Sequence, residues 1–363
     1  RNSSCREYKA EYDTSITYRL AQHLAPYLSV FPKVFSRESW LLIPGNQVTT
    51  VPKNIATDRT IAPEAGINSC FQRAIGKAIA SRLKKQGIDL EDQSNNAMAC
   101  LSAERDCRAT VDMKNCSNSV CLFPILQAFP NDWASLLEVS RSEYYTLDPR
   151  SKVLDRSATW VEYSMLSSMG NGYTFEVETV LFLAIAYAIG CQKHEVWVYG
   201  DDVIIPQAKV SLFTAVCNVF GIEVNPEKSF TSGTFFESCG EYSFGGASIT
   251  PFKIKDLLNG AKDTIILANK IRVFAHLLGH GNNCDRRFLP SWRACVGTLP
   301  ADQRIKLRGP AGSGLTLFCN LDETKPRMDK KIWGLSYWCL QPKINFNRGK
   351  YFSFVAEGLL WTR

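Results

Sequence analysis

The sequence lacks the patterns that define several common protein classes. It has no Cys-x-x-Cys pair, and its 13 cysteines stand singly along the chain. An odd number of scattered cysteines argues against a secreted disulfide scaffold and indicates reduced thiols in a cytosolic protein. The longest uncharged apolar run, Val180 to Cys191, has about 12 residues, whereas a helix needs about 20 to cross a bilayer. We therefore expect no membrane span and no membrane partner.

Histidine is scarce, and an initiator methionine is missing. His276, His280 and Cys284 are spaced by four and would share one helical face, as zinc ligands can. The sequence offers no second ligand pair nearby, so a helix end with hydrogen-bonded histidines is favoured over a zinc site. The chain begins at Arg1 without a signal-like apolar stretch, which favours a fragment or a processed product.

What the sequence does contain is enough apolar material for a folded, enzyme-sized body. Of 363 residues, 45% are hydrophobic and 11% aromatic, which predicts one large articulated body or two to three subdomains. The periodicity of residues 68–85 and the apolar character of residues 174–189 predict two helices. Short β-like runs lie at 109–111, 195–199 and 203–205. Helices and strands interleave without regular βαβ alternation, which predicts an α+β fold.

Positive charge is concentrated near the C-terminus. The chain has a formal net charge of +7, and residues 301–363 hold 11 Lys and Arg against 5 Asp and Glu. Aromatic residues alternate there with basic ones such as Lys330 and Lys331. Because cations neutralise phosphates and aromatic faces stack on unpaired bases, this composition suits a single-stranded nucleic acid, with Lys330 and Lys331 as candidate RNA-binding residues. A solvated basic face over an aromatic core explains the segment equally well.

The strongest chemical pattern is a pair of adjacent aspartates, Asp201 and Asp202, between two apolar β-runs. A hairpin would present both carboxylates at its tip, with an ordinary solvated turn as the alternative. Upstream, another β-run ends in a lone carboxylate, Asp112. If the strands lie side by side, Asp112 and Asp201 can bridge two Mg²⁺ ions, or Mn²⁺, roughly 3.5 to 4 Å apart. That geometry activates both oxygens in phosphoryl transfer.

These aspartates belong to a wider pattern. It extends over four segments, at residues 51–61, 109–112, 167–176 and 199–202. Together they resemble the replicase catalytic beta subunit, an RNA-directed RNA polymerase, of the leviviruses, the small positive-strand RNA bacteriophages. The third segment is distinctive of that phage family, and the resemblance spans roughly residues 46 to 312.

The resemblance implies a right-hand polymerase with an antiparallel palm sheet. Fingers would lie at 1–105, incomplete at the N-terminus, with a fingers insertion at 122–160. The palm would comprise 106–121, which includes the first catalytic strand, and 161–255. Residues 256–363 would form the thumb and the C-terminal basic region.

The resemblance also implies roles for individual residues in RNA synthesis from NTPs on an RNA template. Asp112, Asp201 and Asp202 would be catalytic metal ligands, with Asp202 assisting, and Lys228 would protonate the departing pyrophosphate. The residues expected to bind the NTP are Lys53, Arg59, Asn118, Ser168, Gly170, Asn171, Gly172, Thr174 and Glu178. The glycines among them would let backbone amides approach a template or nucleotide closely. Residues 235–252 would form a hairpin that supports the growing 3′ end.

At Asn118 the sequence departs from the family, which normally has an Asp there in a ribose-sensing network. An amide still offers a donor and an acceptor to a 2′-OH, but it cannot repel or ligate as a carboxylate does. Ribose selection is therefore open at this position. Two alternatives to an RNA polymerase stay open. A reverse transcriptase would also have a hairpin with paired aspartates, and Asn118 together with the short N-terminus is compatible with a catalytically impaired, polymerase-like fragment that only binds RNA.

The resemblance further implies partners and a cellular setting. The holoenzyme would recruit the host translation elongation factors Tu and Ts and an RNA-binding ribosomal protein. The expected location is the cytoplasm of the infected bacterial host.

Overall fold

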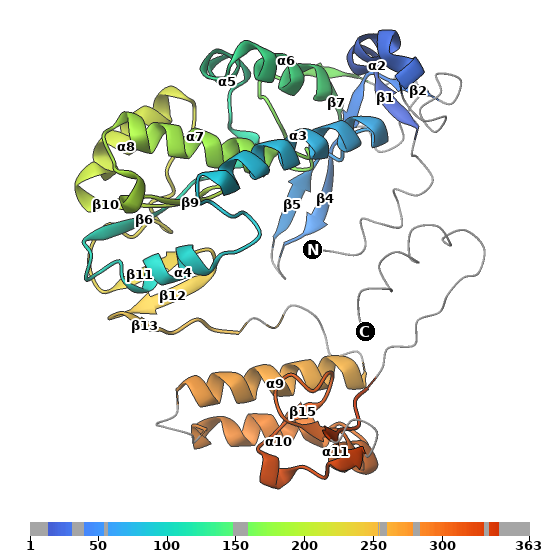
Figure 1. Ribbon diagram of the computed structural model, residues 1–363, viewed down its shortest axis with the longest axis vertical. Coiled ribbons are helices and arrows are strands. Elements are labelled where there is room, and N and C mark those ends of the chain that lie inside the picture. Colours follow the sequence, from blue (N-terminus) through green and yellow to red (C-terminus); the bar gives the residue numbers. More distant parts are fainter. Residues whose placement is uncertain are drawn as a thin grey trace. The chain divides into compact units, whose positions relative to one another are not determined.

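The computed structural model describes residues 14–30, 40–53, 57–147, 159–252, 254, 260–278, 284–329 and 334–340. Their helices and strands are shown in Figure 1. The chain divides into two compact units, Arg1–Thr250 and Pro251–Arg363, each with its own hydrophobic core. Within the described ranges, no helix combines the length and the apolar character that a bilayer crossing requires.

A three-stranded antiparallel sheet lies in the core of the first unit. Its strands, in spatial order, are β6 (Arg108–Asp112), β10 (Asp202–Pro206) and β9 (Trp197–Tyr199). Val203, Ile204 and Ile205 in the middle strand are fully buried, because both faces of the sheet are covered. Val203 and Ile205 join the main core, and Ile204 belongs to a separate cluster on the other face. The predicted α+β fold with an antiparallel sheet is confirmed.

Helices cover one face of this sheet. The main core packs β6 and β10 against α7 (Thr174–Ala188) and α8 (Val210–Val219) through residues such as Phe182 and Phe213. Helix α7 is apolar almost all round, as expected for a helix buried between others. Helix α3 (Gly66–Lys85) packs against α7, and both run across the upper part of Figure 1.

The other face of the sheet is covered by a short helix and a β-meander. Helix α4 (Ser94–Leu101) packs with β11 (Phe235–Ser238) and β12 (Glu241–Phe244), which is followed by β13 (Ala247–Ser248). Phe236 and Cys100 are buried there against Ile204. The two residues between β11 and β12, Cys239 and Gly240, both have positive φ, as a tight two-residue hairpin turn requires. The hairpin predicted for residues 235–252 is therefore present.

Smaller elements complete the first unit. The helices are α2 (Tyr18–Leu24), α5 (Leu122–Ala128) and α6 (Asn131–Ser140). The strands form a parallel pair β1 (Ser15–Thr17) and β2 (Leu41–Ile43), a sheet of β3 (Gly45–Gln47), β7 (Tyr144–Thr146) and β8 (Val161–Glu162), and an antiparallel ribbon of β4 (Thr49–Pro52) and β5 (Asp58–Ile61). Short 3₁₀ helices lie at Ala25–Val30, Cys116–Asn118, Lys193–Glu195 and Gln207–Lys209.

The second unit is built on two helices. Helix α9 (Ala261–Leu277) packs on α10 (Leu289–Gly297) around Ile265, Val296 and Leu317. The Asn269 side chain ties α9 to the strand region, because its Nδ2 donates to Thr316 O at 2.6 Å and its Oδ1 accepts from Phe318 N at 2.8 Å. The remaining elements are α11 (Ala301–Lys306), β14 (Arg308–Gly309), β15 (Leu317–Phe318), β16 (Arg327–Asp329), β17 (Gly334–Ser336) and 3₁₀ helices at Arg286–Phe288 and Leu321–Glu323.

The predicted elements match the structure closely. The expected helices at 68–85 and 174–189 are α3 and α7, although α3 begins at Gly66. The β-run expected from residue 195 is wrong at its start, because Glu195 ends a 3₁₀ helix. There the Glu195 side chain accepts the Gln192 N–H, a capping box that turns the chain before β9.

Two predictions rest on residues whose surroundings are only partly described. The boundary after Thr250 lies close to the predicted palm–thumb boundary after residue 255, and the division into fingers, palm and thumb stays a prediction.

Of the three possible zinc ligands, His276 lies in the last turn of α9 and Cys284 is half-buried. The third, His280, lies outside the described residues.

Candidate active site

The adjacent aspartates lie at a tight hairpin between β9 and β10. Tyr199 pairs with Asp202, so the turn consists of Gly200 and Asp201 alone, and Asp202 already belongs to β10. Gly200 has φ +63°, and a Cβ there would lie 2.3 Å from the Phe175 ring. Its amide donates to Thr179 Oγ1 at 3.0 Å. Helix α7 therefore fixes the hairpin tip, and only glycine fits at this position.

Asp112 and Asp202 meet across the paired strands. They are register partners in the β6–β10 ladder, which confirms that the two predicted β-runs lie side by side. Burial, followed by the charges of Asp201 and Asp112, raises the pKa of Asp202 to about 6. Burial also raises the pKa of Asp201, and the Asp112 charge adds to that rise. The three carboxylates thus repel one another in a partly buried place, which favours a bound cation.

Residues 224–230 run along the edge of β6 and hold Asp112 in place. Bridges pair Thr110 with Phe230 and Met113 with Val224. The Asn225 Nδ2 donates to Asp112 Oδ2 at 3.0 Å. The Lys228 Nζ lies 3.9 Å from the same oxygen, so the structure brings this predicted residue to the site.

Sequence reasoning missed two residues of this segment. Asn225 orients the Asp112 carboxylate, and Ser229 Oγ accepts the Asp112 N–H at 3.1 Å. The signal was present in Asn225-Pro226, a turn-forming pair placed just before Lys228. It did not reveal which strand the turn would cross.

Glu178 is a buried acid beside the aspartates. It lies one helical turn after Thr174 in α7, and both side chains are buried. Burial and the nearby Asp201 charge raise the pKa of Glu178 to about 8, while hydrogen bonds with Ser117 and Cys116 oppose that rise. Glu178 Oε1 and Thr174 Oγ1 have no hydrogen-bond partner among the described residues. These two oxygen atoms, next to the hairpin, are therefore available to hydrogen-bond a ligand.

Residues 168–172 form a loop before α7 that is fastened on both sides. The Asn118 Oδ1 accepts the Met169 N–H at 3.1 Å, while its Nδ2 donates to Asn115. On the other side the Gly172 N–H donates to Gln72 Oε1 at 3.0 Å. Ser168 and Asn171 are buried in the loop. Asn118 is therefore joined to the predicted nucleotide-binding loop.

The loop glycines serve close packing within the protein. Gly170 has φ +128°, and a Cβ there would lie 2.6 Å from the Ala62 carbonyl oxygen. A Cβ on Gly172 would lie 3.0 Å from the Arg73 nitrogen. The expectation that these glycines free backbone amides for a ligand is therefore wrong for Gly172, whose amide is already bonded to Gln72.

The basic candidates fall in different places. Lys53 and Arg59 are exposed on the β4–β5 ribbon, where Arg59 pairs with Val51. The Arg59 charge lowers the pKa of Asp201 against the effect of burial, so Arg59 acts on the aspartates. Lys330 and Lys331 lie outside the described residues.

A divalent cation fits the donor chemistry of the aspartate site. Across the described ranges, no group of three or more His, Cys, Asp or Glu side chains is arranged to hold a metal by itself. Mg²⁺ does not require such a cage, since it is commonly bound by one or two carboxylates together with substrate phosphates and water. Asp112 and Asp201 are hard oxygen donors whose mutual repulsion a cation would relieve.

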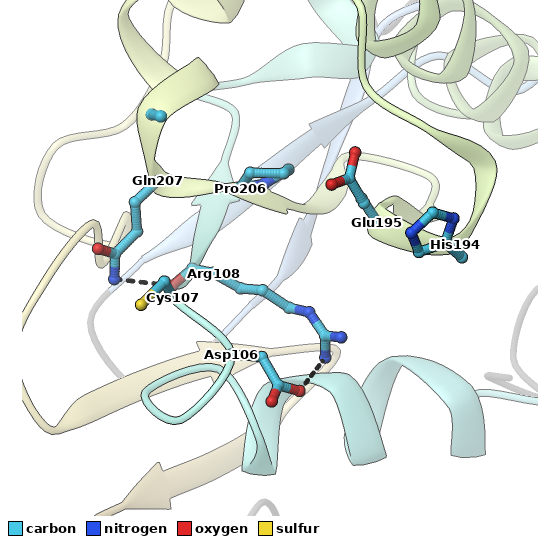
Figure 2. A pocket seen from close by; sticks show the side chains of 8 residues that line it. Asp106, Cys107, Arg108, His194, Glu195, Pro206 and Gln207 are labelled. Carbon is cyan, nitrogen blue, oxygen red and sulfur yellow. Dashed lines mark hydrogen bonds and ion pairs between the residues drawn. The ribbon is translucent and has the colours of Figure 1, made fainter.

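The opposite end of the same strands forms a surface pocket of about 510 Å³ (Figure 2). Its lining includes Asp106, Arg108, His194 and Gln207. Arg108 Nη1 lies 2.9 Å from Asp106 Oδ2, and the Gln207 side chain donates to the Arg108 carbonyl oxygen. The charged groups of this pocket largely satisfy one another, unlike those at the aspartate end.

The fold and the site together define an α+β protein with paired aspartates at the hairpin of an antiparallel sheet. The chain belongs to the RNA replicase beta-chain family, whose model matches residues 2–304.

Relatives from RNA phages are similar over most of the chain. It is 38% identical over 242 residues to the RNA-directed RNA polymerase subunit beta of Escherichia virus Qbeta, covering 65% of this chain and 40% of that protein. It is 36% identical over 298 residues to the same subunit of Enterobacteria phage SP, covering 80% and 50%. The chain thus spans about half the length of the curated relatives it matches. Among solved structures, the RNA-dependent RNA polymerase of a human picorbirnavirus aligns with a TM-score of 0.45 and 10% identity, over 70% of this chain and 55% of that one.

Proposed function

We propose that the chain synthesises RNA from NTPs on an RNA template, as the names of its relatives describe them. The observation that carries the proposal is the convergence of Asp112 and Asp201 with Lys228 at one end of an antiparallel sheet. Carboxylates that hold cations beside a lysine suit the transfer of a nucleotidyl group.

The aspartates and the lysine would have different roles in this reaction. Asp112 and Asp201 would hold Mg²⁺, or Mn²⁺, with Asp202 assisting. When bound, the metal would lower the pKa of the attacking 3′-OH and neutralise triphosphate charge. Lys228, exposed and 3.9 Å from Asp112, would give a proton to the departing pyrophosphate.

The nucleotide would be bound by groups around the hairpin. Arg59 is placed to neutralise phosphate charge, because its charge already acts on Asp201, and Lys53 lies on the same ribbon. The buried polar atoms of Thr174 and Glu178 would face the ribose and base. Ser168, Gly170, Asn171 and Gly172 would shape the loop against which the nucleotide lies.

The second unit would serve as thumb and contact RNA. Trp338 follows β17 and is half exposed, and the guanidinium of Arg327 in β16 lies 5.0 Å from the centre of its ring. A cation over an aromatic ring next to Lys330 and Lys331 in sequence suits a single-stranded RNA segment. Residues 1–105 and 122–160 would be fingers, and 106–121 and 161–255 palm.

The chain would work within a larger assembly in the cytoplasm of the infected bacterium. Its relatives are named as subunits, which supports a complex. Elongation factors Tu and Ts and an RNA-binding ribosomal protein are the proposed host partners. Co-purification of the chain with each factor tests this part.

The decisive experiment is Mg²⁺-dependent NTP incorporation on a C-ended RNA template, with and without the host factors. We expect incorporation that depends on the template and stops when EDTA is added. Filter binding of RNA without any incorporation would instead support the non-catalytic alternative. A preference for dNTPs over NTPs would support a reverse transcriptase, an alternative kept open because Asn118 is engaged by Met169 and Asn115.

A further inference from the structure

A single buried glutamine joins the loop 168–172 to the body of the first unit. Gln72 lies in α3 and is completely inaccessible to solvent. Its Oε1 accepts the Gly172 N–H at 3.0 Å, and its Nε2 donates to the Ser140 carbonyl oxygen at 2.8 Å. One side chain therefore joins two backbone groups from segments far apart in sequence, and the Gly172 N–H has its hydrogen-bond partner in Gln72.

Tight backbone packing surrounds this bond. Gly76 lies one turn after Gln72, and a Cβ there would come within 3.0 Å of the Gly172 carbonyl oxygen. A Cβ on Gly172 would meet the Arg73 nitrogen and the Gln72 Cβ, both at 3.0 Å. The loop consequently rests directly on the α3 backbone, and little movement is open to it while the bond lasts.

The loop is in turn connected to the aspartate hairpin. Helix α7 begins at Thr174, two residues after Gly172, and carries the Thr179 hydroxyl that accepts the Gly200 N–H at 3.0 Å. At its other end the loop is bonded through Met169 to Asn118. A shift at Gly172 would therefore move both the start of α7 and the loop residues proposed to face the nucleotide.

We propose that Gln72 is a positioning residue that sets nucleotide affinity by fixing the loop 168–172 and the start of α7. It touches neither the aspartates nor the proposed nucleotide position, and it acts through the Gly172 amide. The expected change in KM for the NTP rests on the proposed function, whereas the expected change in hydrogen exchange rests only on the contacts of Gln72.

A matched control lies one turn earlier on the same helix. Asn68 is also fully buried, and its Nδ2 donates to the same Ser140 oxygen at 2.9 Å and to Thr17 Oγ1 at 2.8 Å. Its Oδ1 accepts the Thr17 N–H at 3.0 Å. Asn68 therefore bridges α3 to β1 in the way Gln72 bridges α3 to the loop, without bonding to the loop itself.

The test compares Gln72→Met with Asn68→Leu in the full chain, by amide hydrogen exchange and by NTP incorporation. We expect Gln72→Met to speed exchange in the peptide spanning 167–176 about tenfold and to raise KM for the NTP about tenfold, with kcat changed less than about threefold. Asn68→Leu should lower the unfolding midpoint comparably while leaving that peptide and KM unchanged. Gly172→Ala, which pushes the loop off α3, should reproduce the Gln72→Met pattern and serves if Gln72→Met does not fold.

The outcomes separate the two proposals. Equal exchange and equal KM in the Gln72 and Asn68 variants would overturn the positioning role and leave a purely structural one. A wild-type chain that incorporates no NTP would contradict the proposed function, and the exchange of peptide 167–176 would then decide the role of Gln72 alone.

Discussion

The two ends of strands β6 and β10 differ in their charged side chains: one end holds an ion pair, and the other holds neighbouring carboxylates. At one end, Arg108 lies 2.9 Å from Asp106 (Figure 2). The Arg108 guanidinium also stacks 4.1 Å from the centre of the Trp197 ring. At the other end, Asp112 and Asp202 face each other across the ladder with Asp201 in the adjoining turn. The pKa values differ accordingly, since Arg105 and Ser102 lower that of Asp106 to about 2, whereas burial raises that of Asp202 to about 6.

One short sheet thus has charges that support folding at one end and carboxylates suited to binding a metal at the other. Charges that are paired within the protein need no ligand, and they stabilise the surroundings of the strand ends modestly. Partly buried carboxylates that repel each other destabilise the folded chain unless a cation joins them. The strand ends where Asp112, Asp201 and Asp202 repel one another are therefore the place where a metal and a triphosphate would bind.

Neutralising one acid at each end of the sheet should have very different effects on turnover. Asp201→Asn and Asp112→Asn should lower kcat for NTP incorporation about 10²–10³-fold, because each removes a group that holds charge-stabilising metal. Asp202→Asn should be the mildest of the three, because the Asp202 carboxylate already accepts hydrogen bonds from Cys239 and would only assist in holding the metal.

The matched substitution at the opposite end is Asp106→Asn. It breaks the ion pair with Arg108 and should shift the unfolding midpoint slightly while leaving kcat at the wild-type value. Wild-type turnover in Asp201→Asn would end the assignment of the reacting centre to the aspartate end.

The two ends should also differ in how stability responds to pH. The pKa of Glu178 is raised from 4.5 to about 8 in the folded chain, so the folded form holds a proton that the unfolded form has lost. Stability should therefore fall as pH rises between these values, by up to about 1.4 kcal/mol per pH unit for this one group. Urea unfolding in EDTA at pH 5 to 8 checks this, and Glu178→Gln should flatten the curve.

The pairing at Asp106 predicts the reverse dependence. Its pKa is lowered, so the stability it contributes is present above the ordinary pKa of an aspartate and is lost as pH falls toward 2. Asp106→Asn should thus leave the curve between pH 5 and 8 unchanged. A Glu178→Gln curve parallel to wild type would show that Glu178 is ionised when folded.

A smaller effect is expected from the basic segment of the second unit. RNA affinity should fall linearly in a log–log plot against salt, with a slope of about −0.7 per phosphate contacted on a single strand. Reversing the charges of Lys330 and Lys331 should flatten this slope. Lys84 and Lys85 are neighbours in sequence at the end of α3, in the first unit. Reversing both of their charges is the matched control and should leave the salt slope unchanged. Equal slopes in both variants would make the Lys330 segment a solvated face.

The smallest effect concerns Asn118. Asn118→Asp keeps an acceptor for the Met169 N–H and loses only the donation to Asn115, so NTP incorporation should stay within a few fold. If the amide instead weakens ribose selection, the Asp variant should raise the NTP-over-dNTP ratio of kcat/KM about tenfold or more. Steady-state incorporation of ATP and dATP opposite U measures the ratio. An unchanged ratio in both Asn118→Asp and Asn118→Ala would show that this side chain does not sense ribose.

The aspartate end could be predicted from sequence because its signals are local. The apolar runs around Asp201 gave the hairpin, and the lone carboxylate after 109–111 gave the partner strand. Helices α3 and α7 were visible in the spacing and density of their apolar residues. Such patterns depend on neighbours in the chain, so one sequence suffices to see them.

The supports of the site could not be predicted in the same way. Gln72 and Asn225 meet residues 100 and 113 positions away, and a buried amide in a helix or turn carries no local mark of its partner. The glycines at 170 and 172 were visible, but their use in packing on Ala62 and α3 depends on tertiary contacts. Long-range hydrogen bonds between short polar side chains and backbone are therefore what the structure adds.

Locating the bound metal on the chain would show whether the aspartate end is the reacting centre. When Fe²⁺ replaces Mg²⁺, added hydrogen peroxide oxidises it and yields hydroxyl radicals that cut the backbone near the bound ion, while ascorbate regenerates Fe²⁺; mass spectrometry then identifies the cut residues. We predict cuts around Asp112 and Asp201, suppressed by excess Mg²⁺ and by Asp201→Asn but not by Asp106→Asn. Cuts around Asp106 and Glu195 at the opposite pocket, or none that excess Mg²⁺ suppresses, would contradict the assignment of the metal to the aspartate end.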